Sequence, residues 1–313
     1  MEIEKKQKIA ALIPCLNEGT TIKKVITDLR TYIPEADIYV YDNGSEDQTF
    51  KEASDAGAYV HIFSRKGKGN VIRKMFRDID ADIYIMTDGD DTYDLTEIRR
   101  MIDLIKDNSA DMVIGDRLSS NYFSQNKRLM HNSGNRLIRN LINRLFKSNI
   151  NDVLSGLRVM NRNFVKNLPI LTSGFEIESE MTIHALDNNF MIKEIPVCYR
   201  ERHHGSTSKL NTISDGIKVI RLIALLFCDY RPFSFFSFIS VIVALSGIIF
   251  LYPILIEYFK TGLVPRFPTL IVSTLLFTIS LLLFLAGVIL TVIYRHHKRN
   301  YELQLTHWNY IRQ

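Results

Sequence analysis

The sequence predicts an α/β domain built on a doubly wound, mostly parallel sheet, followed by amphipathic helices and a hairpin of two membrane-spanning helices. Two observations predict this organisation. Up to about residue 116, short apolar runs alternate with segments whose apolar residues recur every three or four positions. This alternation is typical of parallel sheets covered by helices on both faces. Near the C-terminus, two long stretches contain no charged residue, as in helices that cross a bilayer.

The predicted strands and helices alternate along the first part of the chain. In the first predicted helix, for example, Ile22, Val25, Ile26 and Leu29 form one apolar stripe. The strands are predicted at residues 9–14, 37–42, 58–63, 82–88 and 111–116, and the helices between them at 20–32, around 50–53, at 71–79 and at 95–105. Ligands bind such sheets beyond the carboxyl ends of the strands, so we expect a site in the loops there.

Composition argues against several classes of protein. The chain has 313 residues and a net charge of +5, which gives no reason to expect nucleic-acid binding. Its three cysteines, Cys15, Cys198 and Cys228, are isolated in the sequence, so we expect neither a disulfide framework nor a zinc site. No signal peptide precedes the first strand, and we therefore expect the catalytic domain to stay in the cytoplasm.

Residues 233–256 and 268–294 are the two predicted membrane spans, because each run is uncharged and long enough to cross a bilayer. Arg231 precedes the first span and Arg295 follows the second, so both termini are expected in the cytoplasm. Helical apolar spacing before the spans predicts an amphipathic interfacial helix, with an ordinary surface helix as the alternative. The expected parts are a cytoplasmic domain over 1–210, the juxtamembrane helix over 211–231, the spans within 232–294 and a cytoplasmic tail over 295–313.

Five polar clusters follow predicted strands. Because the carboxyl ends of parallel strands meet at one edge of the sheet, the five clusters are expected to form one site. The clusters are Asn17-Glu18, Asp42 to Ser45, Arg65 to Gly69, Asp88 to Asp91, and Asp116-Arg117.

The fourth cluster is unusually acidic, with carboxylates at Asp88, Asp90, Asp91 and Asp94. Carboxylates this close repel one another unless a cation lies among them. We predict that Asp88, Asp90 and Asp91 hold Mg²⁺ or Mn²⁺ together with substrate phosphates, and that Asp94 caps the next helix. The alternative for the whole stretch is a solvated acidic turn that caps this helix. The sequence contains neither a P-loop motif nor GxGxxG.

Six motifs occur in an order that resembles the inverting family 2 glycosyltransferases of the polyprenyl-phosphate group, which includes dolichol-phosphate mannose synthase and bactoprenol-phosphate glucosyltransferase. The motifs are IPCLNE (13–18), DNGSEDQT (42–49), RKGKGN (65–70), D-G-D (88–90), DVLSGLR (152–158) and GSTSKL (205–210). The resemblance covers about residues 9–210 and implies a GT-A fold. The two C-terminal spans match a membrane-anchored variant of this group.

The resemblance also implies roles for matching residues. Asp88, Asp90 and Arg117 would be catalytic. The nucleotide sugar would contact Pro14, Leu16, Asn17, Glu18, Asp42, Gly44, Ser45, Lys68, Gly69, Asp88 and Gly89. The acceptor phosphate would contact Arg117, Arg128, Arg202, Ser208 and Lys209, and the sugar pocket would contain Ser155, Gly156, Glu176 and Glu178. Many members read D-A-D-L-Q where this chain reads D-G-D-D-T, so Thr92 stands where a ligand glutamine is possible, and Asp91 or a water is the expected substitute.

The expected function is metal-dependent, inverting transfer of a hexose from UDP-GlcNAc or UDP-glucose to undecaprenyl or dolichyl phosphate, for cell-envelope glycans or glycoproteins. The attacking phosphate is already anionic near pH 7, so the site needs cations more than a general base. The alternatives are a processive polysaccharide synthase, although Trp308 is the only tryptophan and lacks the QxxRW context, and a non-catalytic membrane-anchored nucleotide-sugar-binding protein. Residues 129–146 are expected either at the membrane surface near the acceptor or as a plain packed helix. Homo-oligomerisation is left open.

Overall fold

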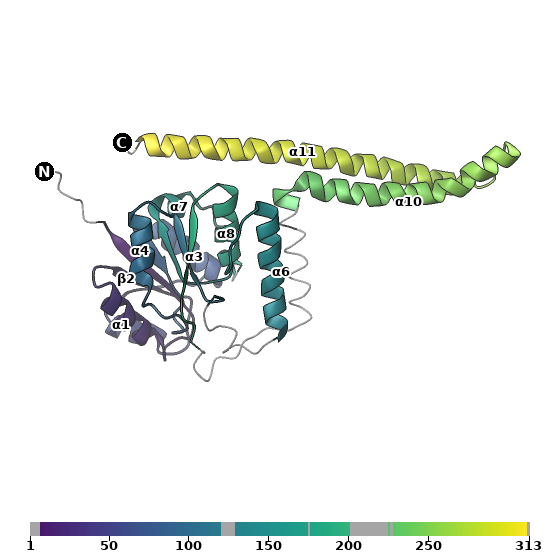
Figure 1. Cartoon of the computed structure of the whole chain (residues 1–313). Helices are drawn as coiled ribbons and strands as arrows, with labels where there is room; N and C mark the ends of the chain where they lie inside the picture. Colours follow the sequence, from purple (N-terminus) through teal and green to yellow (C-terminus); the bar gives the residue numbers. More distant parts are fainter. Residues whose placement is uncertain (1–6, 120–128, 175, 201–224, 226–227, 312–313) are drawn as a thin grey trace. The chain divides into compact units, whose positions relative to one another are not determined.

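The computed structural model describes residues 7–119, 129–174, 176–200, 225 and 228–311 (Figure 1). The chain divides into two compact units, Met1–Leu210 and Asn211–Gln313. Most of the predicted juxtamembrane helix at 211–231 lies outside the described residues.

The first unit contains a seven-stranded sheet in the order β3-β2-β1-β4-β6-β5-β7. All neighbouring pairs are parallel except those of β6, which runs antiparallel to both β4 and β5. The predicted doubly wound, mostly parallel sheet is therefore confirmed. The strands are β1 Ile9–Cys15, β2 Asp37–Asp42, β3 Tyr59–Ile62, β4 Ile83–Met86, β5 Met112–Asp116, β6 Arg158–Asn161 and β7 Ile192–Pro196.

Several helices cover the sheet because they have an apolar stripe that packs on alternate residues of the strands. In α1, the stripe from Ile22 to Leu29 is buried in one core cluster with Ile9, Ala11 and Ile13 of β1. The stripe of α4 lies in the same cluster, whereas α3 and α7 pack on β1, β4 and β6 with residues outside it. The helices are α1 Ile22–Tyr32, α2 Thr49–Asp55, α3 Lys68–Asp78, α4 Ile98–Lys106, α6 Leu129–Phe146, α7 Arg162–Asn167 and α8 Ile177–Asp187.

The α6 helix packs against α8 through part of its apolar face. Ile138, Ile142 and Leu145 are buried, whereas Leu137 is 50% exposed. The packed-helix alternative is thus confirmed for the buried side. Contact of the exposed side with a membrane stays a prediction.

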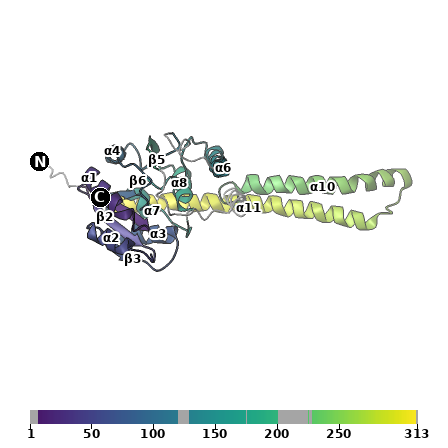
Figure 2. The ribbon, with the colours of Figure 1, turned by 90° about the horizontal axis from the view of Figure 1, so that it is seen from below.

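The second unit consists of α10 Pro232–Thr261 and α11 Phe267–Ile311, which lie side by side in both views (Figures 1 and 2). Ser240 and Ser280 join them, since each hydroxyl donates to the other residue's carbonyl at 2.9 Å. A third bond runs from the Ser273 hydroxyl to the Gly247 carbonyl at 3.0 Å. Both helices are long and apolar enough to cross a membrane, as the sequence predicts.

Candidate active site

The loops after β1 and β2 form one surface at the carboxyl edge of the sheet. The backbone N–H of Asn17 donates to the Ser45 hydroxyl at 2.9 Å. The Ser45 backbone and hydroxyl in turn donate to Asp42 Oδ1 at 2.8 and 2.6 Å. Gly44 adopts φ +83° at the turn, which favours glycine. The structure therefore brings these predicted nucleotide-sugar residues together.

Asn43, which the sequence did not single out as a site residue, fixes the next loop. Its Oδ1 accepts from the backbone of Gly67 at 2.7 Å, and its Nδ2 donates to the carbonyl of Phe63 at 2.8 Å. Gly67 has φ +115°, and a Cβ there would lie 2.2 Å from the Ser173 carbonyl oxygen. Only glycine fits this approach. It places Lys68 as the first residue of α3.

Lys68 bridges two acidic groups from different elements. Its Nζ lies 2.5 Å from Asp88 Oδ1 after β4 and 2.5 Å from Glu178 Oε1 of α8. Burial lowers the pKa of Lys68, but the charges of Asp88 and Glu178 outweigh it and raise that pKa above its ordinary value. Gly156 borders the same carboxylate, because a Cβ there would lie 2.5 Å from Asp88 Oδ2. The predicted site residues Lys68 and Gly156 thus border Asp88, and Glu178 joins them through Lys68.

The D-G-D turn is held by two threonines. The Thr21 hydroxyl donates to the Gly89 carbonyl at 2.7 Å. The Thr92 hydroxyl donates to Asp90 Oδ1 at 2.6 Å. Thr92, where the sequence departs from the family pattern, therefore orients the neighbouring carboxylate.

The remaining two carboxylates of this stretch have cationic or backbone partners. Asp91 pairs with Lys24 and, at 3.1 Å, with Arg200. Its role as a metal ligand stays a prediction. Asp94 Oδ1 accepts from the Thr96 backbone at 2.9 Å and caps the turn before α4. The helix N-cap itself is Glu97, so the predicted position of the cap is wrong by three residues.

Glu18 is a buried acidic residue beside the D-G-D turn. Its Oε2 is buried and has no hydrogen-bond partner among the described residues. Burial, reinforced by the charges of Asp90 and Asp88, raises the pKa of Glu18 to about 8. Burial and the nearby Glu18 also raise the pKa of the Cys15 thiol. Burial and the neighbouring carboxylates therefore disfavour the charged form of Glu18 at this position.

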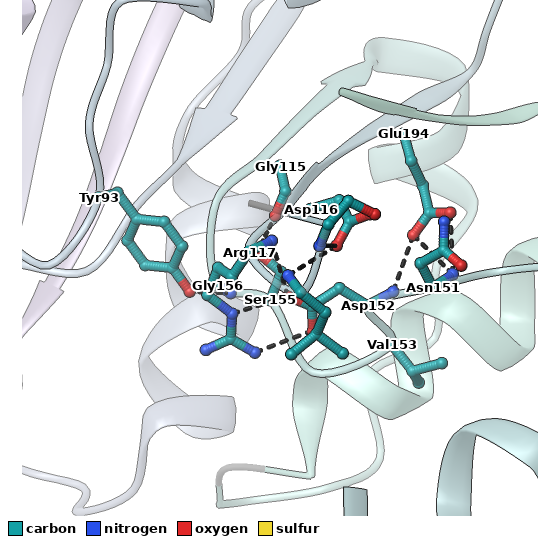
Figure 3. A network of polar contacts seen from close by, with 12 residues as sticks. Tyr93, Gly115, Asp116, Arg117, Asn151, Asp152, Val153, Ser155, Gly156 and Glu194 are labelled. Atoms are coloured by element: carbon teal, nitrogen blue, oxygen red, sulfur yellow. Dashed lines mark hydrogen bonds and ion pairs between the residues drawn. The ribbon is translucent and has the colours of Figure 1, made fainter. Parts of the chain in front are cut away.

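Arg117 is fixed by a bidentate ion pair (Figure 3). Its Nε and Nη2 donate to the two oxygens of Asp152 at 2.7 and 2.9 Å. The guanidinium lies 5.9 Å from the ring centroid of Tyr93 and 5.7 Å from that of Tyr199. Glu194 accepts from the backbone of Asp152 at 2.9 Å. The predicted arginine is thus presented in one orientation.

The loop before β6 is held by a fully buried arginine that the sequence did not reveal as a site component. Arg158 donates to the carbonyls of Val153 and Ser155 at 2.8 and 3.0 Å. Burial lowers its pKa to about 10. The Ser155 hydroxyl donates to the Gly115 carbonyl at 2.6 Å. The one sequence feature that could have indicated this role is the position of Arg158 directly before the two apolar residues Val159 and Met160.

A family model described as glycosyl transferase family 2 matches residues 10–168. The chain belongs to glycosyl transferase family 2. It is 34% identical over 209 residues to the glycosyltransferase AglJ of Haloferax volcanii, covering 66% of this chain and 68% of AglJ. It is 26% identical over 212 residues to the dolichyl-phosphate hexose transferase of the same organism, covering 67% of this chain and 90% of that protein.

The fold of this glycosyltransferase is also found in a solved structure. Glucosyl-3-phosphoglycerate synthase from Mycobacterium tuberculosis, in a complex with Mn²⁺, UDP and glucosyl-3-phosphoglycerate, superposes with a TM-score of 0.57 at 20% identity. The match covers 71% of this chain and 79% of the synthase. The predicted GT-A fold and family membership are confirmed.

For several other predicted residues, the described contacts do not include Asp88 or Arg117. Arg128, Arg202, Ser208 and Lys209 lie outside the described residues. Pro14 is buried at the end of β1, Leu16 is half exposed beside it, and Gly69 packs against the backbone of residues 172–173. Glu176 is exposed at the N-cap of α8.

The described residues fit a divalent cation. Among them, no group of three or more His, Cys, Asp or Glu side chains is arranged to hold a metal. Sites for Mg²⁺ or Mn²⁺ that share the ion with substrate phosphates use one or two carboxylates, and Asp88 and Asp90 are hard oxygen donors of this kind. Oε2 of Glu18 is buried beside them without a hydrogen-bond partner among the described residues, and the charges of Asp90 and Asp88 disfavour ionisation of this group. A cation bound here would offset that repulsion.

Proposed function

We propose that this glycosyltransferase transfers a hexose from a UDP-sugar, UDP-GlcNAc or UDP-glucose, to a polyprenyl phosphate, with inversion and with Mg²⁺ or Mn²⁺. The observation that carries the proposal is the pair of fixed cations, Lys68 and Arg117, at one sheet edge with the carboxylate of Asp88. Transfer to a phosphate needs such groups because two anions must approach each other. The relative named dolichyl-phosphate hexose transferase, aligned over 90% of its length, supports this acceptor.

On the donor side, the residues have separate tasks. Asp42, held by Ser45, would meet the nucleoside, and Lys68 would meet the diphosphate. Asp88 and Asp90 would hold the divalent ion, which neutralises charge on the departing nucleotide diphosphate when bound. Glu178 keeps Lys68 charged and in place.

On the acceptor side, the attacking group is a phosphate oxygen that is already anionic near pH 7. A general base therefore contributes little, and orientation of the phosphate matters more. Arg117 would bind this phosphate while Asp152 and the two tyrosines hold its guanidinium. Arg128, Arg202, Ser208 and Lys209 are proposed as further phosphate contacts.

The two apolar helices would anchor the enzyme in the bilayer that contains the polyprenyl acceptor, with the catalytic domain and both termini in the cytoplasm. Both helices are long enough to span, and cations flank them on the side of the termini.

The test is a donor panel with the full chain in lipid nanodiscs. Labelled UDP-glucose, UDP-GlcNAc, UDP-galactose and GDP-mannose are each supplied with undecaprenyl or dolichyl phosphate and Mn²⁺ or Mg²⁺. We expect one UDP-sugar to give a monoglycosyl lipid, and EDTA or Asp90→Asn to abolish it. Asp55→Asn, at an exposed position of α2, is the matched control and keeps activity.

Three results would contradict the proposal. A polymer would indicate a processive synthase. Nucleotide-sugar binding by a folded chain without any product would indicate a non-catalytic binding protein. Product formed only from GDP-mannose would support the proposed polyprenyl phosphate acceptor but would contradict the proposed UDP-sugar donor.

A further inference from the structure

The carboxylate of Asp91 is enclosed by two cations from distant parts of the chain. Its Oδ1 lies 3.1 Å from Arg200 Nη1, and its Oδ2 pairs with Lys24 of α1. Its side chain is only 9% exposed. Arg200 also contacts Asp94 at 3.3 Å and Asp28 at 3.8 Å. Both carboxylate oxygens of Asp91 are thus engaged by protein cations.

The backbone at Asp91 makes this arrangement informative. Asp91 adopts φ +55°, in the left-handed region that few residues other than Gly, Asn and Asp occupy. Asp91 lies in the bend that contains Gly89 and Asp90. The ion pairs therefore hold the residue that sets the shape of the turn.

The same segment is joined to the residues that follow β7, which include Arg200. Tyr93 and Tyr199 form an isolated antiparallel bridge, and their rings lie edge to face with centroids 5.9 Å apart. The backbone N–H of Arg200 donates to the Thr92 carbonyl at 2.8 Å. Arg200 is consequently held at its backbone as well as at its guanidinium, and both contacts keep its side chain next to Asp91.

We propose that Asp91 is a positioning residue and not a metal ligand, and that its pairs with Lys24 and Arg200 form a clamp that sets the D-G-D turn for the donor. The proposal rests on the proposed function for what the turn binds. A carboxylate that already has two cationic partners must lose them before it can bind a metal ion. Asp88 differs in that only one of its oxygens, Oδ1, pairs with a cation, Lys68, and Asp88 and Asp90 stay the proposed donors to the metal.

The clamp and the ligand hypotheses predict opposite effects when the cations are removed. If Asp91 binds the metal, Lys24→Gln or Arg200→Gln frees its carboxylate and leaves metal affinity equal or higher. If the cations position the turn, the same variants weaken donor binding. Asp91→Asn alone does not distinguish the two, but it keeps a residue that tolerates positive φ, so its effect reports the lost charge.

The experiment uses the full chain in nanodiscs, with UDP in the presence of Mn²⁺ as the probe. Calorimetry should find UDP bound about five- to tenfold more weakly in Lys24→Gln and in Arg200→Gln, as for loss of a partly exposed ion pair. Arg200→Lys should recover most of the affinity. Asp91→Asn combined with Arg200→Gln should weaken UDP binding by less than the two single effects multiplied, because the two variants share the loss of the Asp91–Arg200 pair.

Hydrogen exchange without ligand gives an independent readout. Amides of residues 89–94 should exchange faster in Lys24→Gln and Arg200→Gln than in the unaltered chain. The control is Arg99→Gln, whose arginine is comparably exposed and forms a bidentate pair with Glu35 at 2.7 and 3.1 Å. It should leave both the exchange of this segment and UDP affinity unchanged.

The outcomes separate the two proposals. Unchanged exchange at 89–94, or unchanged or tighter UDP binding after removal of either cation, overturns the clamp. If the unaltered chain binds no UDP with Mn²⁺, the proposed donor fails, and hydrogen exchange alone decides whether the clamp exists.

Discussion

Gly156 approaches the Asp88 carboxylate so closely that any side chain must displace it. An added Cβ would lie 2.5 Å from Asp88 Oδ2. We expect Gly156→Ala to lower the transfer rate by about 100-fold, as small displacements of reacting groups do, with little change in melting temperature.

Gly57→Ala is the control. Gly57 has φ +82° in another part of the domain, so that variant should lose about 1 kcal/mol of stability and keep its rate per folded molecule. Equal rate losses in both variants would refute the local explanation.

Glu18 gives the folded chain a distinctive pH dependence. Its pKa rises from 4.5 to about 8 on folding, first because of burial. Between these values the folded chain binds more protons than the unfolded chain, so the free energy of unfolding falls as pH rises. The contribution is complete below about pH 4.5 and is lost toward pH 8. Glu18→Gln should make the fall in the free energy of unfolding with pH less steep, by up to about 1.4 kcal/mol per pH unit. Urea unfolding at several pH values from 5 to 8 measures this dependence. An unchanged slope would contradict this assignment.

At the scale of elements, β6 delivers a buried arginine to the loop that carries Asp152. Arg158 donates to three oxygen acceptors, the carbonyls of Val153 and Ser155 and the Thr182 hydroxyl, and to the Met112 sulfur. Arg158→Lys keeps the charge but satisfies fewer of these groups, and unsatisfied buried groups each cost about 1–3 kcal/mol. We expect a loss of about 3 kcal/mol in denaturant unfolding. Arg162→Lys, which alters a largely exposed pair with Asp80, should lose less than about 1 kcal/mol. Similar losses in both would argue against the buried network.

The helical hairpin depends on a close approach at Gly247. A Cβ there would lie 3.4 Å from Leu276 and Phe277 side-chain atoms, so alanine nearly fits and leucine does not. We expect Gly247→Leu to slow disulfide formation between cysteines placed at Ser240 and Ser280 by about fivefold. Gly247→Ala should leave it within about twofold. Equal rates in both would show that the helices do not pack here.

Elements with strong local signals were predictable from the sequence, and those defined by distant contacts were not. The five strands and four helices up to Asp116 follow from periodicity, and the parallel topology then predicts that their polar loops converge. β6 and β7 were missed because these short strands lie beyond the regular alternation of strands and helices, and β6 pairs antiparallel between two strands that are distant in the sequence. The partner of Asp91 was equally hidden, since Arg200 lies 109 positions away. Local patterns locate site residues, whereas charge pairing across the fold decides their orientation.

At the scale of the whole molecule, the proposed topology predicts which positions face each side of the membrane. Leu263, in the connection between α10 and α11, is 68% exposed, and Leu263→Cys should react with a membrane-impermeant maleimide in intact cells. Cys198 is exposed in the catalytic unit and should react only after the membrane is permeabilised. Labelling of Cys198 in intact cells would invert the topology.

The antiparallel strand β6 also determines when the domain is completed during synthesis. Strands β3, β2, β1 and β4 pair with one another, and all precede residue 87, so this half-sheet can form while translation continues. In the described sheet, β5 pairs only with β6 and β7, which are made later. The apolar residues of β5, including Val113 and Ile114, therefore have no paired strand on the nascent chain until β6 and β7 are synthesised. Exposed apolar segments of this kind bind chaperones or aggregate. The enzyme is therefore most prone to aggregation after β5 has been synthesised and before β6 has been.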